Sequence, residues 1–348
     1  MVPEKVEKIA VLGAGVMGHT IAQIAASAGF EVTVRDIAQE YIDNAKNRVE
    51  RNLMRNVERG RITEEAARDA LSRLSYSLDL AGSVRDADLV IEAIPENLDL
   101  KRRVWREVSG FVRDDAILAT NTSSLSITRI AEAVTKPERF IGMHFFNPPT
   151  HMRLVELIPG EETDPTTLEE AKAVAERLGK TPVVVEKDVV GFIVNRILIT
   201  YLNEAAKLAE SGDYTVEQID AAMQYRAKMP LGPFMLSDLI GIDIVHHILK
   251  VFEENLDASY RPAENIVALF EEKKLGQKTG EGFYSYAQRP SVEEAIGEGF
   301  DVDLLLDVLI EEAEKVAAEG IAGREDIDTA MKLGANLPKG PFELKEGK

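Results

Sequence analysis

A histidine and a glutamate stand twelve residues apart in an apolar stretch near the middle of the chain, IGMHFFNPPTHMRLVE, residues 141–156. An imidazole beside a carboxylate is a general acid/base at neutral pH, because the carboxylate sets the ring tautomer and raises its basicity. His144 and Glu156 therefore qualify for proton transfer. The alternative is a buried histidine that an acid satisfies for structural reasons, and the two residue types alone do not decide between these interpretations.

The segments around this pair predict how the two side chains meet. RFIGMHFF and MRLVELI have strand-like compositions, and the turn formers NPPTH separate them, which predicts an antiparallel hairpin. Directly opposed residues of a hairpin project to one face, so His144 and Glu156 are expected to lie side by side. His151 is the only nearby second imidazole and lacks helical spacing, so we predict no metal site.

A glycine-rich motif, GAGVMG, lies near the start of the chain between a predicted strand and a predicted helix. Its first glycine permits a tight turn, its second lets the backbone approach a pyrophosphate, and its third lets the helix pack closely on the strand. The N–H groups at the start of the helix face the phosphates. The motif predicts a dinucleotide site formed by Gly13, Gly15, Val16, Met17 and Gly18.

An acidic residue ends the next predicted strand. Asp36 stands eighteen residues after Gly18, where a carboxylate accepts hydrogen bonds from the adenosine ribose and repels a 2′-phosphate. The positive charge of Arg35, beside it, would instead attract a 2′-phosphate. We therefore predict NAD as the cofactor and a Rossmann-type doubly wound α/β sheet as the first domain.

A long charged helical segment, residues 38–75, follows where a compact doubly wound fold would return to the sheet. Its arginines recur at three- and four-residue steps with an asparagine beside them, which places them on one helix face. The term cationic face is used here for these five residues: Arg48, Arg51, Asn52, Arg55 and Arg59. In a chain of formal net charge −19, it is either a solvated surface or a site for a phosphate-bearing anion, and the pattern leaves both open.

Polar residues also follow two further predicted strands. Glu92 lies near the end of LVIEA and Asn97 stands four residues after it, and Asn121 and Ser123 come after AILAT. Ligands of open α/β sheets bind beyond the carboxyl ends of the strands, so these side chains are expected near the cofactor or substrate. Ser124 is expected instead to cap the helix that follows.

Length and composition exclude several classes of protein. A chain of 348 residues predicts two or three domains, and its negative net charge argues against nucleic-acid or anionic-lipid partners. No apolar run approaches the about 18 residues of a membrane span, and the N-terminus has no long apolar signal segment. There is no cysteine for thiolate or disulfide chemistry. We expect a cytoplasmic protein without nucleic-acid or membrane partners.

Six motifs in one order resemble the 3-hydroxyacyl-CoA dehydrogenase family over about residues 5–286: GAGVMG, IEAIPEN, TNTSSLSI, HFFNPP, GFIVNRI and KLGQKTGEGFYSY. The resemblance implies NAD-dependent, reversible oxidation of an (S)-3-hydroxyacyl-CoA to the 3-oxoacyl-CoA, in fatty-acid β-oxidation or short-chain acyl-CoA metabolism. An acyl-CoA is then the substrate. Coenzyme A carries the phosphates that the cationic face would bind.

The same resemblance implies roles for individual residues. His144 matches the general acid/base, Glu156 its orienting partner, and Ser123 and Asn195 the hydrogen-bonding residues around the substrate oxygen. The implied cofactor contacts are Glu92, Lys101 and Asn121. The implied substrate contacts are Asn52 and Arg59, where the family more often carries serine and lysine, with Arg55 between them on the cationic face.

The second half of the chain is helical and internally repeated. IDAAMQYRAKMPLGPF, from Ile219, recurs as IDTAMKLGANLPKGPF, from Ile327, and two such copies are expected to pack together. The predicted organisation is an NAD-binding domain, a helical C-terminal domain, a linker and a truncated second repeat, over residues 1–187, 188–286, 287–300 and 301–348.

The second repeat stops soon after Phe342, whereas the first runs on. It is therefore either degenerate or cut short. Two-repeat members of the family it resembles are often joined to an enoyl-CoA hydratase, which makes a fused or associated hydratase a hypothesis. One-repeat members usually dimerise through the helical domain. Here the second copy can fill part of the partner's place, so a homodimer and a monomer both stay open.

Two other functions fit parts of the sequence. An L-gulonate-type dehydrogenase of free hydroxy acids shares the HFFNP region, but the cationic face argues against it. A lambda-crystallin-like protein that binds NAD without turnover keeps the same fold. The presence of His144, Glu156, Ser123 and Asn195 argues against that loss of catalysis.

Overall fold

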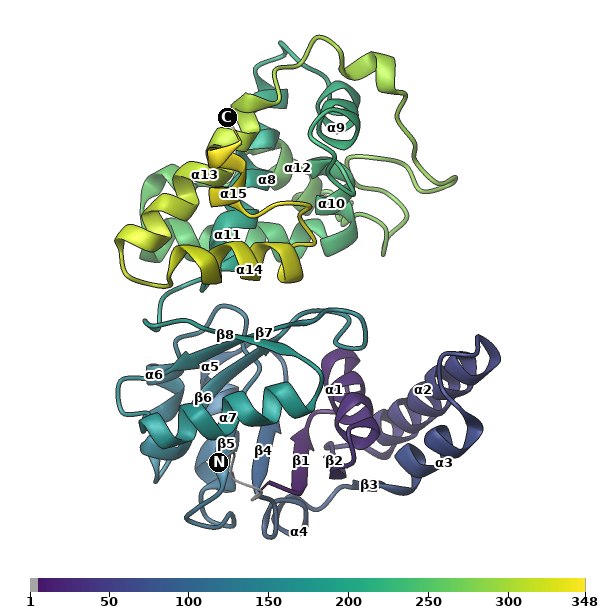
Figure 1. Ribbon diagram of the computed structural model, residues 1–348, viewed down its shortest axis with the longest axis vertical. Coiled ribbons are helices and arrows are strands. Elements are labelled where there is room, and N and C mark those ends of the chain that lie inside the picture. The colour runs from purple at the N-terminus through teal and green to yellow at the C-terminus, as the bar shows by residue number, and fades with distance from the viewer. Residues whose placement is uncertain (1–5, 348) are drawn as a thin grey trace. The chain divides into compact units, whose positions relative to one another are not determined.

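One eight-stranded sheet forms the centre of the first of two units, with strand order β3-β2-β1-β4-β5-β6-β7-β8 (Figure 1). The computed structural model describes residues 6–347; the first unit extends to Asp188 and the second begins at Val189. Neighbouring strands are parallel except β6 and β7, which are antiparallel. The strands are β1 Lys8–Leu12, β2 Glu31–Arg35, β3 Leu74–Ser77, β4 Leu89–Glu92, β5 Ile117–Thr120, β6 Phe140–Phe145, β7 Leu154–Pro159 and β8 Thr181–Val184. The predicted doubly wound fold is confirmed.

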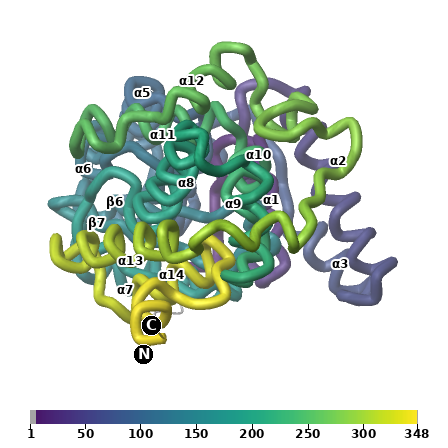
Figure 2. The backbone as a smooth tube through the Cα atoms, turned by 90° about the horizontal axis from the view of Figure 1, so that it is seen from above, coloured from purple at the N-terminus to yellow at the C-terminus, as the bar shows by residue number. Residues whose placement is uncertain are grey.

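Helices cover the sheet and extend beyond one edge of it. They are α1 Val16–Ser27, α2 Gln39–Glu58, α3 Glu64–Ser72, α4 Leu80–Val84, α5 Leu98–Val108, α6 Ile127–Ala131, η1 Pro137–Arg139 and α7 Pro165–Arg177. The charged segment after Asp36 forms α2 and α3, a helical hairpin that projects beside α1 in both views (Figures 1 and 2). This hairpin brings the cationic face to the same unit as the glycine motif.

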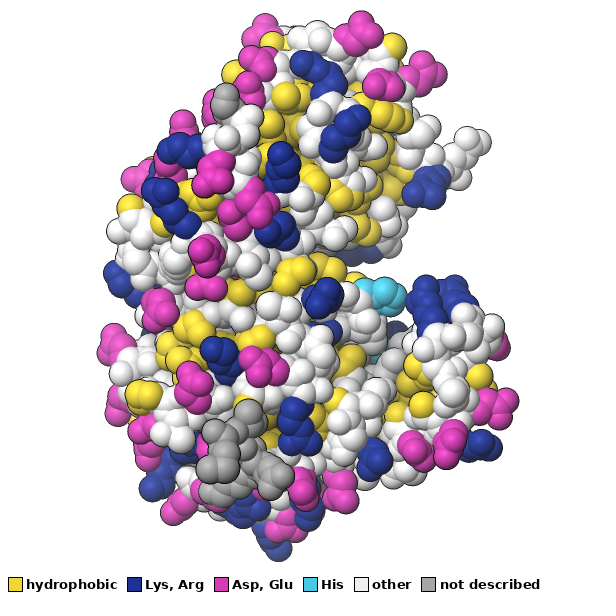
Figure 3. Space-filling model, in the orientation of Figure 1, with side chains coloured by type: hydrophobic (Ala, Val, Ile, Leu, Met, Phe, Trp, Pro, Cys, Tyr) yellow, Lys and Arg dark blue, Asp and Glu magenta, His cyan; other side chains and the backbone are white. Residues whose placement is uncertain are grey.

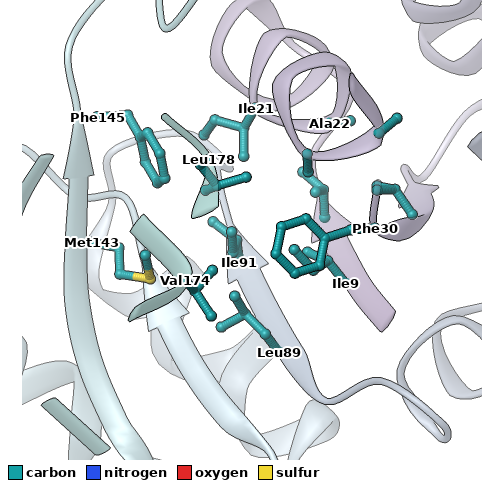
Figure 4. Packing of buried hydrophobic residues seen from close by; sticks show 14 of the residues in the cluster. Ile9, Ile21, Ala22, Phe30, Leu89, Ile91, Met143, Phe145, Val174 and Leu178 are labelled. Carbon is teal, nitrogen blue, oxygen red and sulfur yellow. The ribbon is translucent and has the colours of Figure 1, made fainter. Parts of the chain in front are cut away.

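The core of this unit lies between the sheet and the helices α1 and α7. Ile21 of α1, Val174 of α7 and Phe30 pack against Leu89 and Ile91 of β4 (Figure 4). Strands β4 and β5 are buried along their whole length, as expected for parallel strands with both faces covered. Each large apolar side chain of this layer contributes about 1.5–3 kcal/mol on burial, so the layer holds the strand ends in fixed positions.

The second unit is all helical and contains the sequence repeat. Its helices are α8 Val194–Glu210, α9 Val216–Tyr225, α10 Pro233–Ile240, α11 Ile242–Asn255, η2 Ala258–Tyr260, α12 Glu264–Glu271, η3 Glu294–Gly297, α13 Asp303–Ala318, α14 Arg324–Gly334 and α15 Pro341–Glu346. Helices α13, α14 and α15 repeat α8, α9 and α10. Among the described residues, no helix combines the length and the apolar character needed to cross a membrane.

The repeated motif is a device that caps a helix. Asp220 of α9 accepts hydrogen bonds from the backbone N–H groups of Phe234, at 2.9 Å, and Met235, at 3.1 Å, at the start of α10. A Cβ at Gly232 would lie 2.3 Å from this carboxylate, which explains the glycine before the proline. In the second copy, Asp328 accepts two backbone hydrogen bonds in the same way at the start of α15. Each repeat thus uses a buried acid to satisfy a helix N-terminus.

The buried cap makes the stability of the helical unit depend on pH. Burial raises the pKa of Asp220 to about 7, above the ordinary aspartate value of about 3.9. At a pH between these two pKa values, Asp220 is protonated in the folded state and ionised in the unfolded state. The free energy of unfolding therefore falls as pH rises towards 7. Between pH 5 and 7.5 we expect wild type to lose roughly 1–3 kcal/mol more than Asp220→Asn in urea unfolding. Glu298→Gln, at an exposed acid, should keep the wild-type slope, and equal slopes in all three proteins would contradict the assignment.

Candidate active site

The predicted histidine–glutamate pair is present in the β6–β7 hairpin. The antiparallel register places His144 directly opposite Glu156, and His144 Nδ1 lies 2.7 Å from Glu156 Oε2. Both side chains are buried, at 6% and 0% exposure. Because Nδ1 is engaged with the carboxylate, a proton exchanged with a ligand is exchanged at Nε2.

The turn that joins β6 to β7 is held by a lysine that stands just before β8. The NPPTH turn contains a cis peptide bond between Asn147 and Pro148. Lys180, just before β8, donates hydrogen bonds to the carbonyl oxygens of Pro149 and Met152, the second at 2.7 Å. Burial lowers the pKa of Lys180 to about 8. The sequence patterns do not single out Lys180, because nothing near it predicts that it contacts a turn some thirty residues earlier.

The three glycines of GAGVMG have three different environments. Gly13 has φ of 103°, in the region that side chains disfavour. A Cβ at Gly18 would lie 1.7 Å from the carbonyl oxygen of Gly13, whereas a Cβ at Gly15 would meet no atom within 4 Å. Gly15 and Val16 are exposed at the start of α1, and a bound pyrophosphate fits this open approach. The residues present therefore fit the dinucleotide that the motif predicts.

Gly18→Ala is expected to weaken NADH binding by about tenfold or more. The new methyl group would displace the Gly13 carbonyl and deform the turn that must approach the pyrophosphate, at a cost of at least about 1.4 kcal/mol. Fluorescence titration with NADH measures the dissociation constant. Gly110→Ala is a control, because this exposed glycine has no positive φ and a Cβ there would meet its nearest atom at 3.4 Å. A variant of Gly18 with wild-type affinity would show that the close approach is not needed.

Asp36 lies beside the glycine turn at the end of β2. Its Oδ2 accepts a hydrogen bond from the backbone N–H of Ala14 at 2.6 Å, and its Oδ1 accepts one from Ile37. The neighbouring Arg35 directs its Nε towards the carbonyl oxygen of Leu78 at 3.4 Å. The carboxylate is thus fixed next to the turn, which is consistent with the predicted contact to an adenosine ribose.

Glu92 and Lys101, which are predicted to contact the cofactor, form a buried ion pair. Lys101 Nζ donates to Glu92 Oε1 at 2.6 Å, and Thr120 Oγ1 donates to Glu92 Oε2 at 2.8 Å. Glu92 is 0% exposed and Lys101 is 1% exposed. The last residue of β4 points into the protein, where a charge needs a partner, so this pair supports the strand ends from within. The contact of Glu92 and Lys101 with the cofactor stays a prediction.

The residues after β5 form a loop next to the hairpin. Asn121 Oδ1 accepts a hydrogen bond from the backbone N–H of Phe145 at 2.8 Å, which ties the end of β5 to the residue after His144. Ser123, which is partly exposed, follows in the same loop. Asn97 is exposed, and its Oδ1 accepts a hydrogen bond from the backbone N–H of Leu100 and caps α5.

The helix after this loop has a different cap from the one predicted. Ser126, not Ser124, caps α6 by accepting a hydrogen bond from the backbone N–H of Arg129. Asp188 accepts from Ser126 Oγ at 2.6 Å and from the backbone of Ile127 at 3.0 Å, and so stabilises that start. Ser124 instead donates a hydrogen bond to the carboxylate of Glu96, a residue of the IPEN segment that is not among the predicted site residues.

Asn195 belongs to the second unit. It lies in the first turn of α8, and its side chain is partly buried. The next residue, Arg196, is buried and pairs with Glu312 of α13. The first turn of α8 is thus held by the second repeat, and the contact of Asn195 with a substrate is a proposal.

The cationic face is exposed, as its pattern predicts. Its arginines lie on the outer side of α2, while the opposite side is buried through Ile42, Val49 and Leu53. Figure 3 shows blue Lys and Arg side chains gathered over this hairpin. Asn52 is partly buried, and its Nδ2 donates to Gln23 Oε1 of α1 at 3.3 Å. The face is therefore joined to the helix that starts at the glycine motif.

Comparison with known proteins agrees with this geometry. Residues 8–189 match the NAD binding domain of 3-hydroxyacyl-CoA dehydrogenase, and residues 191–286 and 299–346 match its C-terminal domain. The chain is 44% identical to a 3-hydroxybutyryl-CoA dehydrogenase of Bradyrhizobium diazoefficiens, over 81% of this chain and 96% of the relative. It is 42% identical to a mitochondrial hydroxyacyl-coenzyme A dehydrogenase of Rattus norvegicus, over 81% and 91% of the two chains.

A solved structure extends the likeness to the second repeat. The crystal structure of 3-hydroxybutyryl-CoA dehydrogenase from Escherichia coli superposes with a TM-score of 0.93 at 28% identity, and covers 98% of this chain and 91% of that chain. The family match to the C-terminal domain likewise includes the second repeat. The chain belongs to the 3-hydroxyacyl-CoA dehydrogenase family, and its first unit is the NAD-binding domain of that family.

Proposed function

We propose that this protein catalyses the NAD-dependent, reversible oxidation of an (S)-3-hydroxyacyl-CoA to the 3-oxoacyl-CoA. The observation that carries the proposal is the buried pair of His144 and Glu156, 2.7 Å apart, in the domain that binds NAD. A hydride acceptor oxidises an alcohol only if a base removes the hydroxyl proton, and this pair is such a base.

The residues of the chain divide the work of the reaction. Bound NAD supplies a nicotinamide that accepts the hydride from C3 of the substrate. His144 takes the hydroxyl proton at Nε2, and Glu156 holds the ring through Nδ1 and stabilises the imidazolium. Ser123 and Asn195 donate hydrogen bonds to the substrate oxygen as its charge changes. In the reducing direction, His144 returns the proton.

The cofactor side of the proposal rests on the glycine turn and two further residues. Gly13, Gly15 and Gly18 shape the turn, with Val16 and Met17 at the start of α1, and Asp36 accepts from the ribose. Asn121 borders the cofactor at the end of β5, beside Phe145. Glu92 and Lys101 form a buried ion pair that stabilises this edge of the sheet.

The cationic face is proposed to bind the phosphates of coenzyme A through Asn52, Arg55 and Arg59. Arg55→Ala combined with Arg59→Ala is expected to raise KM for acetoacetyl-CoA about 5- to 20-fold, because two charge-assisted contacts are lost. The value of kcat should stay unchanged, since these contacts lie away from C3. A thioester of N-acetylcysteamine lacks the nucleotide, so its KM should not change. Arg68→Ala on α3 is the control. If this change raises KM equally, the effect comes from the overall charge of the region and not from contacts of Arg55 and Arg59 with the phosphates.

The decisive test of the function follows NADH absorbance in three parallel assays. The protein is mixed with NADH and acetoacetyl-CoA, with NADH and free acetoacetate, and with NAD and L-gulonate. We expect turnover only in the assay with acetoacetyl-CoA, where NADH is oxidised. Turnover of L-gulonate without turnover of the ester would indicate that the protein is a dehydrogenase of free hydroxy acids. NADH binding without turnover of any substrate would indicate a lambda-crystallin-like binding protein.

The partners and location of the protein are also proposals. An enoyl-CoA hydratase, fused or associated, is the enzyme that would supply a 3-hydroxyacyl-CoA, and a cytoplasmic location accords with the sequence. In the helical unit, α13 packs against α8, so the second repeat covers a face that a second subunit would otherwise use. Light scattering at several concentrations tests self-association: a constant monomer mass agrees with covering of that face, and a dimer requires another interface.

A further inference from the structure

We propose that His19 is a phosphate-binding residue, whose protonated ring donates a hydrogen bond from Nε2 to a phosphate of a nucleotide bound beside the glycine turn. The inference rests on the proposed function, which brings two phosphate-bearing ligands, NAD and an acyl-CoA, to this unit. His19 stands directly after Gly18, near the start of α1. It belongs neither to the glycine motif nor to the cationic face, so the sequence patterns give it no role.

The ring of His19 lies over the start of α1. Its Nδ1 is 2.6 Å from the carbonyl oxygen of Gly15, the residue whose open side fits a pyrophosphate. Helical side chains lean towards the N-terminus of their helix, and this contact places the ring beside the glycine turn. The residue is only 5% exposed. Among the described residues the ring makes this one hydrogen bond, so Nε2 is available to a ligand.

The bond to Gly15 determines which form of the ring can bind a phosphate. A carbonyl oxygen only accepts hydrogen bonds, so Nδ1 of His19 carries a hydrogen. In the neutral ring Nε2 is then an acceptor, which repels a phosphate oxygen, whereas in the protonated ring Nε2 is a charged donor. The other neutral tautomer would lose the bond to Gly15. Binding of a phosphate by His19 therefore requires the ring to take up a proton.

Helix α2 places the cationic face beside this ring. Gln23 stands one turn after His19 on the same side of α1, and it accepts a hydrogen bond from Asn52 Nδ2 of α2 at 3.3 Å. Arg48 stands one turn before Asn52 on α2 and acts electrostatically on His19. The two helices lie side by side in both views (Figures 1 and 2). The ring thus stands where the glycine turn and the cationic face meet.

The charges around the ring predict that it is neutral until an anion binds. Burial lowers the pKa of His19 and Arg48 acts in the same direction, while the bond to Gly15 opposes them without cancelling them. Helix α1 carries no other charged side chain, and the charged residues of α2 and α3 are exposed. The charged residues at the ends of the adjoining strands are either exposed or bound to backbone groups: Lys8, Glu31, Arg35 and Asp36. A bound phosphate favours the charged ring and raises its pKa, so the affinity for that phosphate falls as pH rises.

Binding of NADH and of coenzyme A at several pH values tests this role without turnover. Fluorescence titration measures the dissociation constant of NADH, and calorimetry measures that of coenzyme A. From about pH 6 to about pH 8.5, the dissociation constant of the ligand that His19 binds should rise about 5- to 20-fold more in wild type than in His19→Ala, because a charge-assisted donor is lost. His19→Gln keeps a neutral donor, so its affinity should be intermediate and its pH dependence that of His19→Ala.

The two ligands distinguish the source of the phosphate. A difference between wild type and His19→Ala for NADH alone assigns His19 to the pyrophosphate of the cofactor, and a difference for coenzyme A alone assigns it to a phosphate of the substrate. The comparison with the variant is needed because a phosphate monoester itself titrates at about pH 6.

Two results would overturn the proposal. One is an equal pH dependence of wild type and His19→Ala for both ligands; the other is a loss of affinity that is the same at every pH, which would make the ring a neutral contact. His151→Gln, at an exposed histidine, should keep the wild-type profile, and thermal melting shows whether each variant is folded. Turnover of acetoacetyl-CoA by wild type establishes the dehydrogenase whatever the result at His19.

Discussion

His144→Gln is expected to lower kcat for the reduction of acetoacetyl-CoA by about 10²–10⁴-fold, the usual contribution of a general acid/base. Glutamine has nearly the same reach and fills the site between Glu156 and Phe146, whose ring lies 4.5 Å from that of His144. It cannot carry a proton, however. The loss should therefore appear in kcat, while the dissociation constant of NADH stays near that of wild type.

The controls for this result separate chemistry from folding. His151→Gln changes an exposed histidine of the adjoining turn and should retain full kcat. Glu156→Gln keeps a hydrogen-bonding side chain but removes the charge that stabilises the imidazolium, so its kcat should fall between those of wild type and His144→Gln. Turnover of His144→Gln at the wild-type rate, with intact NADH binding, would refute the proposed mechanism.

Glu312→Ala is expected to destabilise the helical unit by about 3–5 kcal/mol, the usual cost of removing one partner from a buried ion pair. Arg196 Nε lies 2.5 Å from Glu312 Oε1, and the two side chains are 3% and 1% exposed. Tyr260 donates to the same carboxylate oxygen at 2.7 Å. The alanine variant leaves the guanidinium buried without its main counter-charge, so the free energy of unfolding in urea should fall.

A matched control stands directly after the same helix, at its C-cap. Glu319 also pairs with Arg196, at 3.1 Å, but its side chain is 48% exposed. Its change to alanine should cost no more than about 1 kcal/mol, because exposed ion pairs contribute little. If the two variants lose equal stability, burial does not set the strength of this cluster. A large difference would show that the second repeat is integral to the helical unit, and it would make Asn195, beside Arg196, dependent on that repeat.

Local patterns were sufficient to predict several features of the site. The glycine turn needs only a positive φ at Gly13 and a missing side chain at Gly18, and both follow from a short stretch of sequence. The pairing of His144 with Glu156 also follows locally, since a turn between two strands sets the register of a hairpin. The buried and exposed sides of α2 follow from helical periodicity. In each case the interacting residues are near neighbours along the chain.

Distant acids decided what the local patterns left open. Ser124 and Ser126 are both able to cap a helix, and the choice depends on Asp188, which binds Ser126, and on Glu96, which binds Ser124. These acids are 62 and 28 residues away from their partners, so no local spacing reveals them.

The sequence by itself determined the fold class, the NAD turn, the hairpin pair and the helical repeat, because each depends on the periodicity, turn residues or motif order of a continuous segment. Only the tertiary structure decided that Glu92 and Lys101 are buried together as an ion pair. It also decided that Glu96 holds the Ser123 loop and that Arg196 pairs with Glu312, 116 residues away. The physical reason is that a charge leaves water only where a partner is already placed, and that partner comes from another part of the fold.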